Sequence, residues 1–484
     1  MKQARTPSMG KPKIVIIGAG SLFFGRQAIW AVSQLPGFQN CTLSLVDTDP
    51  VNLNRLDQLA RLAINSEGVT VESFDNYEDA LPGADFVVLS FSKKNAYYRR
   101  IECEVGAKYG IRSCSGDTIG PAGIFHTLRE FPAILDIAHT MEELCPDAWL
   151  INYVNPAATM GIGLMRHSRI KSFALCDTHH MPMKKEGYLK LIGESDTSLD
   201  GLDMRIAGVN HFTWMLKAEL NGRDILPAIR EAFRRGAAGE EDAGYAKNRF
   251  NNAITAQLTD LFGCVPTCTG HTKEYLPFYQ GRAAIQEKIP PLAVFDCDER
   301  ERWTATMWQE IDDYISGKKP ISEFHESVKS DHATDIIHSM VVQDGRTYFI
   351  NRSNTDCVED GGRAVENLPA DAYLEMECQL GPDGPRPFKA GAFPLGLRSL
   401  QYHILDIHEL TIEAIMKEDR ELLVRALSID PLVNSIATAR VLIDELYQRE
   451  REALPEWVGP QTPVSSTDQS PEDRQVELVD VKNY

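Results

Sequence analysis

The chain has 484 residues, of which 43% are hydrophobic and 25% charged, and its formal net charge is −19 at pH 7. This composition is typical of a globular protein with a large core, and the length favours two domains. The negative charge argues against a nucleic acid or an anionic membrane surface as partner, but it leaves room for an anionic substrate in a local cationic pocket.

The ten cysteines form no C-x-x-C pair and the first residues contain no apolar signal segment, so we expect reduced thiols and a cytoplasmic location.

Strands and helices alternate through the first part of the chain. Apolar runs predict strands at residues 13–17, 42–46, 85–91, 149–153 and 171–175, and helical spacing is present at 26–34 and 124–144. This alternation predicts an α/β fold with a doubly wound parallel sheet of the Rossmann type, as in lactate and malate dehydrogenases. We place this first domain at residues 13–195, after an N-terminal tail of residues 1–12.

Beyond residue 195 the pattern becomes mixed. Helical stretches at about 223–263, 301–317 and 401–452 are interleaved with short strand candidates at 346–351 and 372–377. We therefore predict a second, α+β domain over residues 196–457 that carries substrate and subunit contacts. Residues 458–484 are rich in Pro, Ser, Thr and acidic residues, which favours a disordered tail.

A glycine-containing turn directly follows the first predicted strand. Gly18 permits a tight turn, Gly20 lets a pyrophosphate approach the backbone, and Ser21 leads into a helix whose N-terminus favours negative charge. Asp47 ends the second strand, where a carboxylate accepts the ribose hydroxyls of NAD and repels the 2′-phosphate of NADP. The third glycine of the usual fingerprint is missing, although Gly25 comes two residues after its place, so a turn that only joins strand to helix is the alternative.

Cys176 and His211 are the candidate metal ligands. Cys176 follows the strand at 171–175, and ligands in an open α/β sheet collect at the carboxyl ends of the strands. A thiolate and an imidazole are good ligands for a divalent transition ion. Two such residues 35 positions apart are weak evidence alone. A buried Cys that packs as a small hydrophobe and a His bonded to a carbonyl are the alternative.

A set of short motifs occurs in order along almost the whole chain. They are G-A-G-S (18–21), G-D-T-I-G-P-A-G-I-F (116–125), the stretch from M-E-E-L-C-P to Y-V-N-P-A (141–157), L-C-D (175–177), G-V-N-H-F-T-W (208–214), H-T-K-E-Y-L-P-F-Y (271–279), A-F-P-L-G-L (392–397) and L-S-I-D-P-L-V (427–433). In this order they resemble glycoside hydrolase family 4, over about residues 13–457.

The resemblance implies an enzyme that uses NAD⁺ and Mn²⁺, or another divalent metal, instead of a pair of carboxylates. In such enzymes NAD⁺ takes a hydride from sugar C3, a base removes the C2 proton, the metal stabilises the enediolate, and the C1 leaving group is eliminated. Water then adds and the hydride returns, so no net oxidation occurs. By the same resemblance Cys176 and His211 bind the metal, and we expect a homodimer or homotetramer that acts on a small-molecule glycoside.

The resemblance also assigns roles to residues near these motifs. Asp177 takes the place of an acid that protonates the leaving oxygen, although a helix N-cap is the alternative. Asn155, at a strand end before a proline, is expected to contact the substrate or the nicotinamide of the cofactor. Asn210 is expected to orient substrate hydroxyls.

The C2 base is the least defined role. Where members acting on non-phosphorylated sugars often carry a carboxylate before the H-x-x-E-Y motif, this chain has Gly270. Tyr275 is the first candidate, because a tyrosinate serves in the phosphosugar members and a nearby cation would lower its pKa. His271 and Glu274 are the other candidates, and Glu274 is also expected to bind substrate. In the alternative interpretation His271 binds a hydroxyl and Tyr275 packs in the core.

The sequence does not decide which of the family's substrates this chain binds. Residues 90–100 contain two Lys and two Arg, which either receive an anionic sugar or form a solvated basic face. The segment 104–111 is similar to members that act on α-linked non-phosphorylated hexosides, such as α-glucosides, α-galactosides and uronides. The pair Cys176-Asp177 is instead similar to 6-phospho-α-glycosidases.

Two other classes of protein are alternatives. An NAD-dependent 2-hydroxy-acid or sugar dehydrogenase shares the strand-end Asn-Pro but lacks the metal pair, and it would release stoichiometric NADH. A non-enzymatic nucleotide-sensing protein would need no metal and would show no turnover.

Overall fold

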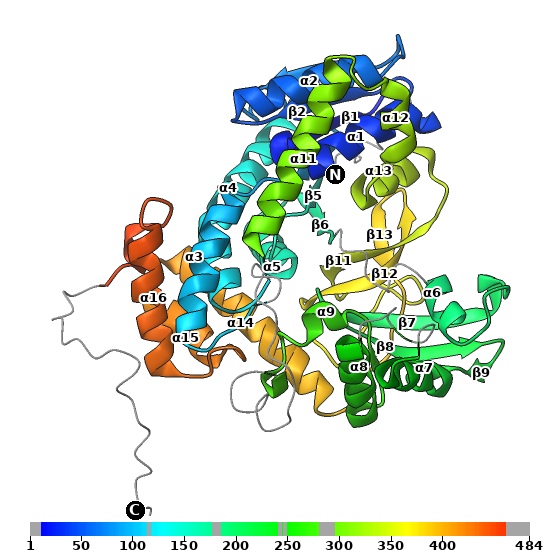
Figure 1. Ribbon diagram of the computed structural model, residues 1–484, viewed down its shortest axis with the longest axis vertical. Helices are drawn as coiled ribbons and strands as arrows, with labels where there is room; N and C mark the ends of the chain where they lie inside the picture. Colours follow the sequence, from blue (N-terminus) through cyan, green and yellow to red (C-terminus); the bar gives the residue numbers. More distant parts are fainter. Residues whose placement is uncertain are drawn as a thin grey trace, which may run out of the picture.

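A computed structural model describes residues 11–113, 118–176, 185–240, 244, 249–279 and 296–460 of the chain (Figure 1). Its centre is one 13-stranded sheet in the order β10-β8-β7-β12-β11-β6-β5-β4-β1-β2-β3, with β13 paired to β12 and β9 to β8. The two predicted tails lie largely outside the described residues. Within the described residues, no helix combines the length and the apolar character needed to cross a bilayer.

Six strands form the parallel part of the sheet. They are β1 (Lys13–Ile17), β2 (Thr42–Val46), β3 (Thr70–Phe74), β4 (Phe86–Leu89), β5 (Trp149–Asn152) and β6 (Lys171–Ala174). Their order is 3-2-1-4-5-6 and every neighbouring pair is parallel, which is the topology of a Rossmann fold. The predicted fold class is therefore confirmed.

The edge strand β3 is the one parallel strand that the sequence analysis did not predict. Its residues T-V-E-S-F are all exposed or half-buried, because only one neighbouring strand pairs with it. A strand in that position has no continuous apolar run, and an apolar run was the signal that predicted the other five.

Helices cover both faces of the parallel sheet. In β1, Ile14 and Ile16 belong to one core cluster, whereas Val15 and Ile17 belong to another. Because successive side chains of a strand point to opposite faces, each cluster lies on its own side of the sheet. The covering helices of this part of the chain are α1 (Phe23–Gln34), α2 (Pro50–Ala63), α4 (Gly120–Leu144) and α5 (Ala157–His167), whereas α3 (Asn95–Lys108) packs against α4.

The remaining strands extend the sheet beyond β6 with antiparallel pairing. β11 (Thr347–Ser353) meets β6 at the pair Asn351 and Ala174, and β12 (Tyr373–Gly381) lies beside it. These are the strands predicted at 346–351 and 372–377. The sheet then continues through β7 (Leu202–Val209), β8 (Phe212–Leu220) and β10 (Val265–Pro266), with β9 (Arg223–Asp224) and β13 (Gly384–Pro387) at the side.

Two of the later helical stretches predicted from sequence are divided into shorter helices. The predicted stretch 223–263 is two helices, α7 and α8, because α7 ends at Gly239 in a left-handed conformation with φ 100°. The stretch 401–452 falls within three helices. The helices of this part are α6 (Lys185–Leu191), α7 (Leu226–Ala238), α8 (Arg249–Phe262), α9 (Thr269–Thr272), α11 (Cys297–Ile315), α12 (Ile321–Ser327), α13 (His332–Val342), α14 (Leu397–Lys417), α15 (Arg420–Ile429) and α16 (Ile436–Glu450).

The chain beyond residue 195 returns to the parallel sheet. Helix α11 lies beside α1 and α2 (Figure 1), where Arg26 pairs with Glu310 at 3.3 Å and Arg55 with Asp312 at 2.9 Å. The second part of the chain thus helps to cover the first, and the domain division at residue 195 stays a prediction.

Candidate active site

The turn after β1 is built on glycines. Gly18 adopts the left-handed conformation with φ 84°, and the amide of Gly20 donates to Oδ2 of Asp47 at 2.7 Å. A Cβ atom at Gly20 would lie 2.7 Å from the same oxygen, so any side chain there would displace the carboxylate. The turn and Asp47 therefore form one unit at the ends of β1 and β2.

Gly25 fills the role of the missing third glycine. A Cβ atom at this position would lie 2.4 Å from the carbonyl oxygen of Ala19, so only glycine lets α1 pack this closely on the turn. Burial raises the pKa of Asp47, and the amides of Asp49 and Gly20 oppose that shift by donating to the carboxylate. Close backbone approach, a helix N-terminus and a carboxylate at the second strand fit the pyrophosphate and ribose of a dinucleotide.

Three further residues lie at the same edge of the sheet, and two of them, Asn155 and Cys176, are predicted site residues. Ser90 follows β4, Asn155 follows β5 and Cys176 follows β6, and these strands run parallel to β1. Ser21 and Ser90 are joined by their hydroxyl groups at 3.4 Å. Asn155 is half-buried and precedes a cis peptide bond to Pro156. The structure thus gathers the nucleotide turn and the candidate thiol ligand at the carboxyl ends of parallel strands, where such folds bind their ligands.

Cys176 and His211 are brought into contact. The Sγ atom of Cys176 lies 3.2 Å from Nε2 of His211, and both side chains are buried. His211 belongs to the tight turn between β7 and β8 and has a positive φ of 63°, a conformation that few non-glycine residues adopt. The turn therefore holds this imidazole in one place beside the thiol.

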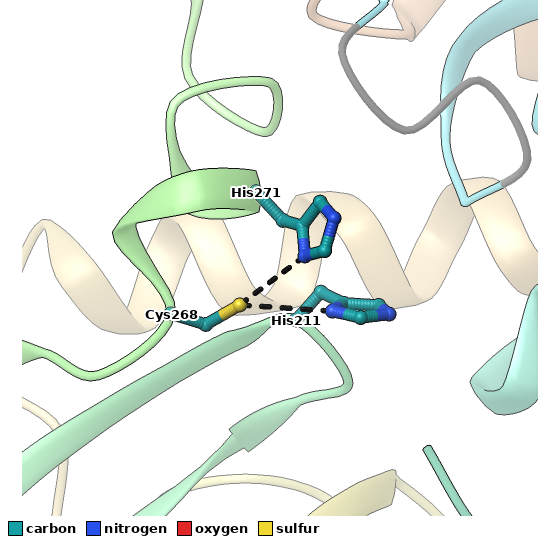
Figure 2. A group of neighbouring side chains, drawn as sticks. All are labelled: His211, Cys268 and His271. Carbon is teal, nitrogen blue, oxygen red and sulfur yellow. Dashed lines mark hydrogen bonds between the residues drawn. The ribbon is translucent and has the colours of Figure 1, made fainter. Parts of the chain in front are cut away.

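A second thiol and a second imidazole lie beyond the other nitrogen of His211. The Sγ atom of Cys268 lies 3.6 Å from Nδ1 of His211 and 3.3 Å from Nδ1 of His271. Figure 2 shows that the three side chains point toward one another. His271 is a candidate from sequence and Cys268 is not, although the two residues form a C-x-x-H spacing that is typical of metal ligands.

A buried carboxyl group supports the turn that carries His211. Oε2 of Glu375 accepts a hydrogen bond from Nδ2 of Asn210 at 3.2 Å, and the amide of His211 also donates to this carboxyl group. Burial raises the pKa of Glu375 to about 7. Asn210 thus has a structural partner in β12, and Glu375 is a further residue that the sequence analysis missed.

Two of the candidates for the C2 base are buried. Tyr275 is buried and stacks on Phe212 with ring centroids 5.3 Å apart, while Glu274 is fully buried. Burial raises the pKa of Tyr275 well above its ordinary value, although a hydrogen bond with Thr118 opposes the shift. A Cβ atom at Gly270 would meet nothing within 4 Å, so this position opens onto space.

The electrostatic environment of His271 includes two cations. Burial lowers the pKa of His271 to about 4, and the charges of Lys273 and Arg99 add to this effect. Arg99 is buried on α3, whereas Lys93 and Lys94 of the same basic segment are exposed. Arg100 pairs with Asp298 of α11 at 2.8 Å. The basic residues of this segment therefore lie in different surroundings, and Arg99 is the one whose charge acts on the candidate site.

The predicted acid Asp177 lies outside the described residues. Its neighbour Cys176 is described and belongs to the candidate site. The role of Asp177 stays a prediction.

Comparison with protein families gives two matches. A model described as family 4 glycosyl hydrolase matches residues 13–187, and a model of the C-terminal domain of the same family matches residues 206–433. Together they cover most of the chain, including the nucleotide turn, Cys176 and the segment that carries His211, Cys268 and His271.

Known relatives match over nearly their full lengths. An alpha-galactosidase of Bacillus subtilis (strain 168) is 29% identical, with 92% of this chain and 99% of the relative covered. An alpha-galacturonidase of Lachnoclostridium phytofermentans is 27% identical, with 92% and 97% covered. Other relatives include a probable 6-phospho-beta-glucosidase of Bacillus subtilis, 26% identical, with 92% and 98% covered.

Solved structures share the fold. A putative glucosidase from Bacillus subtilis has a TM-score of 0.76 at 23% identity, covering 90% of this chain and 99% of that chain. A 6-phospho-alpha-glucosidase from gut microorganisms, solved in complex with NAD and Mn²⁺, has a TM-score of 0.75 at 19% identity, covering 92% and 99%. The ligands of that second structure are those expected here from sequence.

Proposed function

The chain belongs to family 4 of the glycosyl hydrolases, and we propose that it cleaves a glycosidic bond through transient oxidation at sugar C3 and removal of the C2 proton. The C1 leaving group then departs by elimination. The proposed enzyme depends on NAD⁺ and on a divalent metal, with Mn²⁺ as the first candidate.

The observation that carries this proposal is the contact of Cys176 with His211 at the same sheet edge as the nucleotide turn. Sγ and Nε2 lie 3.2 Å apart, and Gly18 and Asp47 follow neighbouring parallel strands of the same sheet. A direct-displacement glycosidase needs a pair of carboxylates and has no use for a dinucleotide site.

The groups of the chain have distinct tasks in this proposal. When bound, NAD⁺ would supply a hydride acceptor for sugar C3 and the divalent ion would supply a Lewis acid. Cys176 and His211 would hold the ion, and Asp47 would accept the ribose hydroxyls. The Gly18–Ser21 turn, with the helix that follows it, is proposed to receive the pyrophosphate.

Proton transfer falls to residues near the ligand pair. Asp177 is the proposed acid for the leaving oxygen. Tyr275 is the proposed C2 base, which requires that the bound divalent ion offset the burial that raises the pKa of its phenol, and His271 and Glu274 are the other candidates. Asn155 and Asn210 are proposed to orient the sugar and the nicotinamide. Glu375 acts as a positioning residue, because it bonds to Asn210 and to the amide of His211.

The proposed substrate is an α-linked hexoside without a phosphate group. The alpha-galactosidase relative, at 29% identity, supports a neutral hexoside. The charges of Arg99 and Lys273, which act on His271, favour a second candidate with an anionic sugar. The alpha-galacturonidase and 6-phospho-beta-glucosidase relatives represent the two kinds of anion, a uronate and a phosphate.

A panel of nitrophenyl glycosides tests the proposal. The dialysed enzyme is assayed with α- and β-linked glucosides, galactosides, galacturonides and 6-phosphoglucosides, with NAD⁺, Mn²⁺ and a thiol reductant present together or omitted singly. We expect turnover of an α-linked substrate only in the complete mixture and no build-up of NADH. Full activity of the dialysed enzyme without NAD⁺ would contradict the redox mechanism, and stoichiometric NADH would identify a dehydrogenase instead.

A further inference from the structure

His211, Cys268 and His271 converge from separate segments of the chain. His211 lies in the turn between β7 and β8, Cys268 precedes α9, and His271 lies on α9 (Figure 2). One potential ligand atom from each residue lies within 4.8 Å of those of the other two. The rings of His211 and His271 meet edge to face, with centroids 4.2 Å apart.

The two sulfur–nitrogen distances in this cluster match those of ligands that share one ion. A tetrahedral zinc ion with Zn–S of about 2.3 Å and Zn–N of about 2.0–2.1 Å separates its sulfur and nitrogen ligands by about 3.6 Å. The Sγ atom of Cys268 lies 3.6 Å from Nδ1 of His211 and 3.3 Å from Nδ1 of His271. Both sulfur–nitrogen distances are therefore within about 0.3 Å of the separation expected around one zinc ion.

The chemical types of the three ligands determine which ion the site prefers. A thiolate and two imidazoles prefer Zn²⁺ and similar thiophilic ions, whereas Mn²⁺ prefers oxygen ligands. Three protein ligands also leave the fourth tetrahedral position for a water molecule or a substrate oxygen.

We propose that Cys268, His271 and Nδ1 of His211 form a second metal site, which binds Zn²⁺ and thereby competes with the ion held by Cys176 and Nε2 of His211. Binding converts the Cys268 thiol into a zinc-bound thiolate and releases one proton to solvent, with no change of oxidation state.

The competition follows from the chemistry of one imidazole ring. A neutral imidazole has a lone pair on only one of its two nitrogens. When Nδ1 binds zinc, Nε2 carries the proton and presents N–H to Cys176, so it cannot hold the other ion. Zn²⁺ at the second site therefore inhibits the enzyme. This inhibition rests on the proposed function, whereas the existence of the second site does not.

Direct binding tests the site without any assay of activity. The metal-free full-length protein is titrated anaerobically with Zn²⁺ in a calorimeter and with Co²⁺ in a spectrophotometer, where thiolate-to-cobalt charge transfer absorbs in the near ultraviolet. The Cys176→Ser variant removes the thiol on the Nε2 side. We expect it to keep one Zn²⁺ and the thiolate absorption, and Cys176→Ser/Cys268→Ser to lose both.

Inhibition tests the competition. We expect Zn²⁺ to inhibit the wild-type enzyme and Mn²⁺ to relieve the inhibition. In Cys268→Ser the inhibition constant should rise by more than about 100-fold, beyond the usual cost of a lost second-shell partner, while activity with Mn²⁺ persists. Cys264→Ser is the matched control, because Cys264 is also buried and lies four positions earlier, and its Zn²⁺ inhibition should equal that of the wild type.

Two results would overturn the proposal. One is a folded Cys176→Ser protein, checked by circular dichroism, that binds no Zn²⁺. The other is unchanged Zn²⁺ inhibition in Cys268→Ser and Cys268→Ala, because zinc would then act at the Cys176 side. If no glycoside is turned over, the proposed function fails, but zinc binding by Cys176→Ser still decides whether the second site exists.

Discussion

The Sγ atom of Cys176 lies 3.2 Å from Nε2 of His211, although the two residues are 35 positions apart in the chain. Cys176 follows the last parallel strand, whereas His211 lies in a hairpin of the antiparallel extension. The site therefore exists only where the two parts of the sheet are correctly joined. The same ring reaches Cys268 through its other nitrogen, so His211 is the centre of the ligand cluster.

Loss of either ligand should abolish catalysis without preventing nucleotide binding. We expect Cys176→Ser and His211→Ala to weaken Mn²⁺ binding by more than about 100-fold, which exceeds the usual cost of a lost second-shell partner. NAD⁺ affinity should stay near that of the wild type, because Gly18, Gly20 and Asp47 lie at other strand ends. Calorimetry with each ligand separately measures both effects.

The control for this pair is Cys145→Ser. Cys145 is buried between α4 and β5, and its removal should leave Mn²⁺ affinity unchanged. Wild-type activity of Cys176→Ser at low Mn²⁺ would show that the ligand assignment is wrong.

Substitution of Gly20 should weaken NAD⁺ binding. The new methyl group of Gly20→Ala would lie 2.7 Å from Oδ2 of Asp47 and would displace the carboxylate from the ribose. Loss of a charge-assisted hydrogen bond costs about 1.5–3 kcal/mol, so we expect affinity to fall about 10- to 150-fold. Gly106→Ala is the control, because a methyl group in that helix would make only ordinary contacts at 3.6 Å. Equal NAD⁺ affinity of the two variants would argue against the assigned site.

Acid should destabilise the protein through His408. This residue of α14 is buried, and neither ring nitrogen has a hydrogen-bond partner within the described residues. Burial lowers the pKa of His408 from 6.5 to about 3. A depressed folded-state pKa means that the full stability is present above about pH 6.5 and is lost as the pH falls toward 3.

The variant His408→Gln isolates this contribution. Protonation of the unfolded state at pH 5 lowers the free energy of unfolding of the wild type by about 2 kcal/mol relative to pH 8, and the variant lacks this loss. Urea denaturation at both pH values measures the difference, with the exposed His139→Gln as control. An identical pH dependence of His408→Gln and the wild type would show that His408 is not buried as described.

A buried ion cluster should tie α16 to α3 and α4. Arg129 of α4 donates to Glu102 of α3 at 2.6 Å and to Glu450 of α16, and all three side chains are almost fully buried. Arg129→Met would leave two buried carboxylates without their cation, which typically costs about 3–5 kcal/mol. Burial raises the pKa of both Glu102 and Glu450.

The cost should depend on pH in a defined direction. A raised folded-state pKa gives stability that is present below the unfolded pKa and is lost as the pH rises, so the deficit of Arg129→Met should be larger at pH 8 than at pH 5. The control Arg440→Met breaks an exposed pair with Glu421 and should cost less than about 1 kcal/mol. A deficit that shrinks with rising pH would contradict the ionic explanation.

The parallel sheet could be predicted because burial leaves a local signal. The strands β1, β2, β4 and β5 are buried along most of their length, so their sequences are largely apolar, and β6 is buried in its second half. No local pattern of apolar residues indicates that β11 pairs with β6 at Asn351 and Ala174. Sheet order between distant segments depends on packing of the whole chain, which one sequence does not reveal.

Only part of the site could be predicted from the sequence, because some of its residues carry no local signal. Cys176 and His211 were found through their motifs, whereas Cys268 lacked a motif although its spacing to His271 was readable. Glu375 is an acidic residue within the buried strand β12, and its partners Asn210 and His211 lie more than 160 positions away. Only the folded sheet identifies it as the support of the ligand turn.

The central claim is that the C2 proton of the sugar is removed during cleavage, and NMR of the product formed in D₂O tests it most directly. The enzyme, with NAD⁺, Mn²⁺ and the glycoside that it turns over, is allowed to complete the reaction in D₂O, and free product incubated without enzyme is the control for exchange. We predict deuterium at C2 of the enzymatic product and a primary isotope effect for substrate deuterated at C2 if that step limits the rate. A product with a fully protonated C2 and no isotope effect at that position, from an enzyme shown to need NAD⁺, would contradict the account.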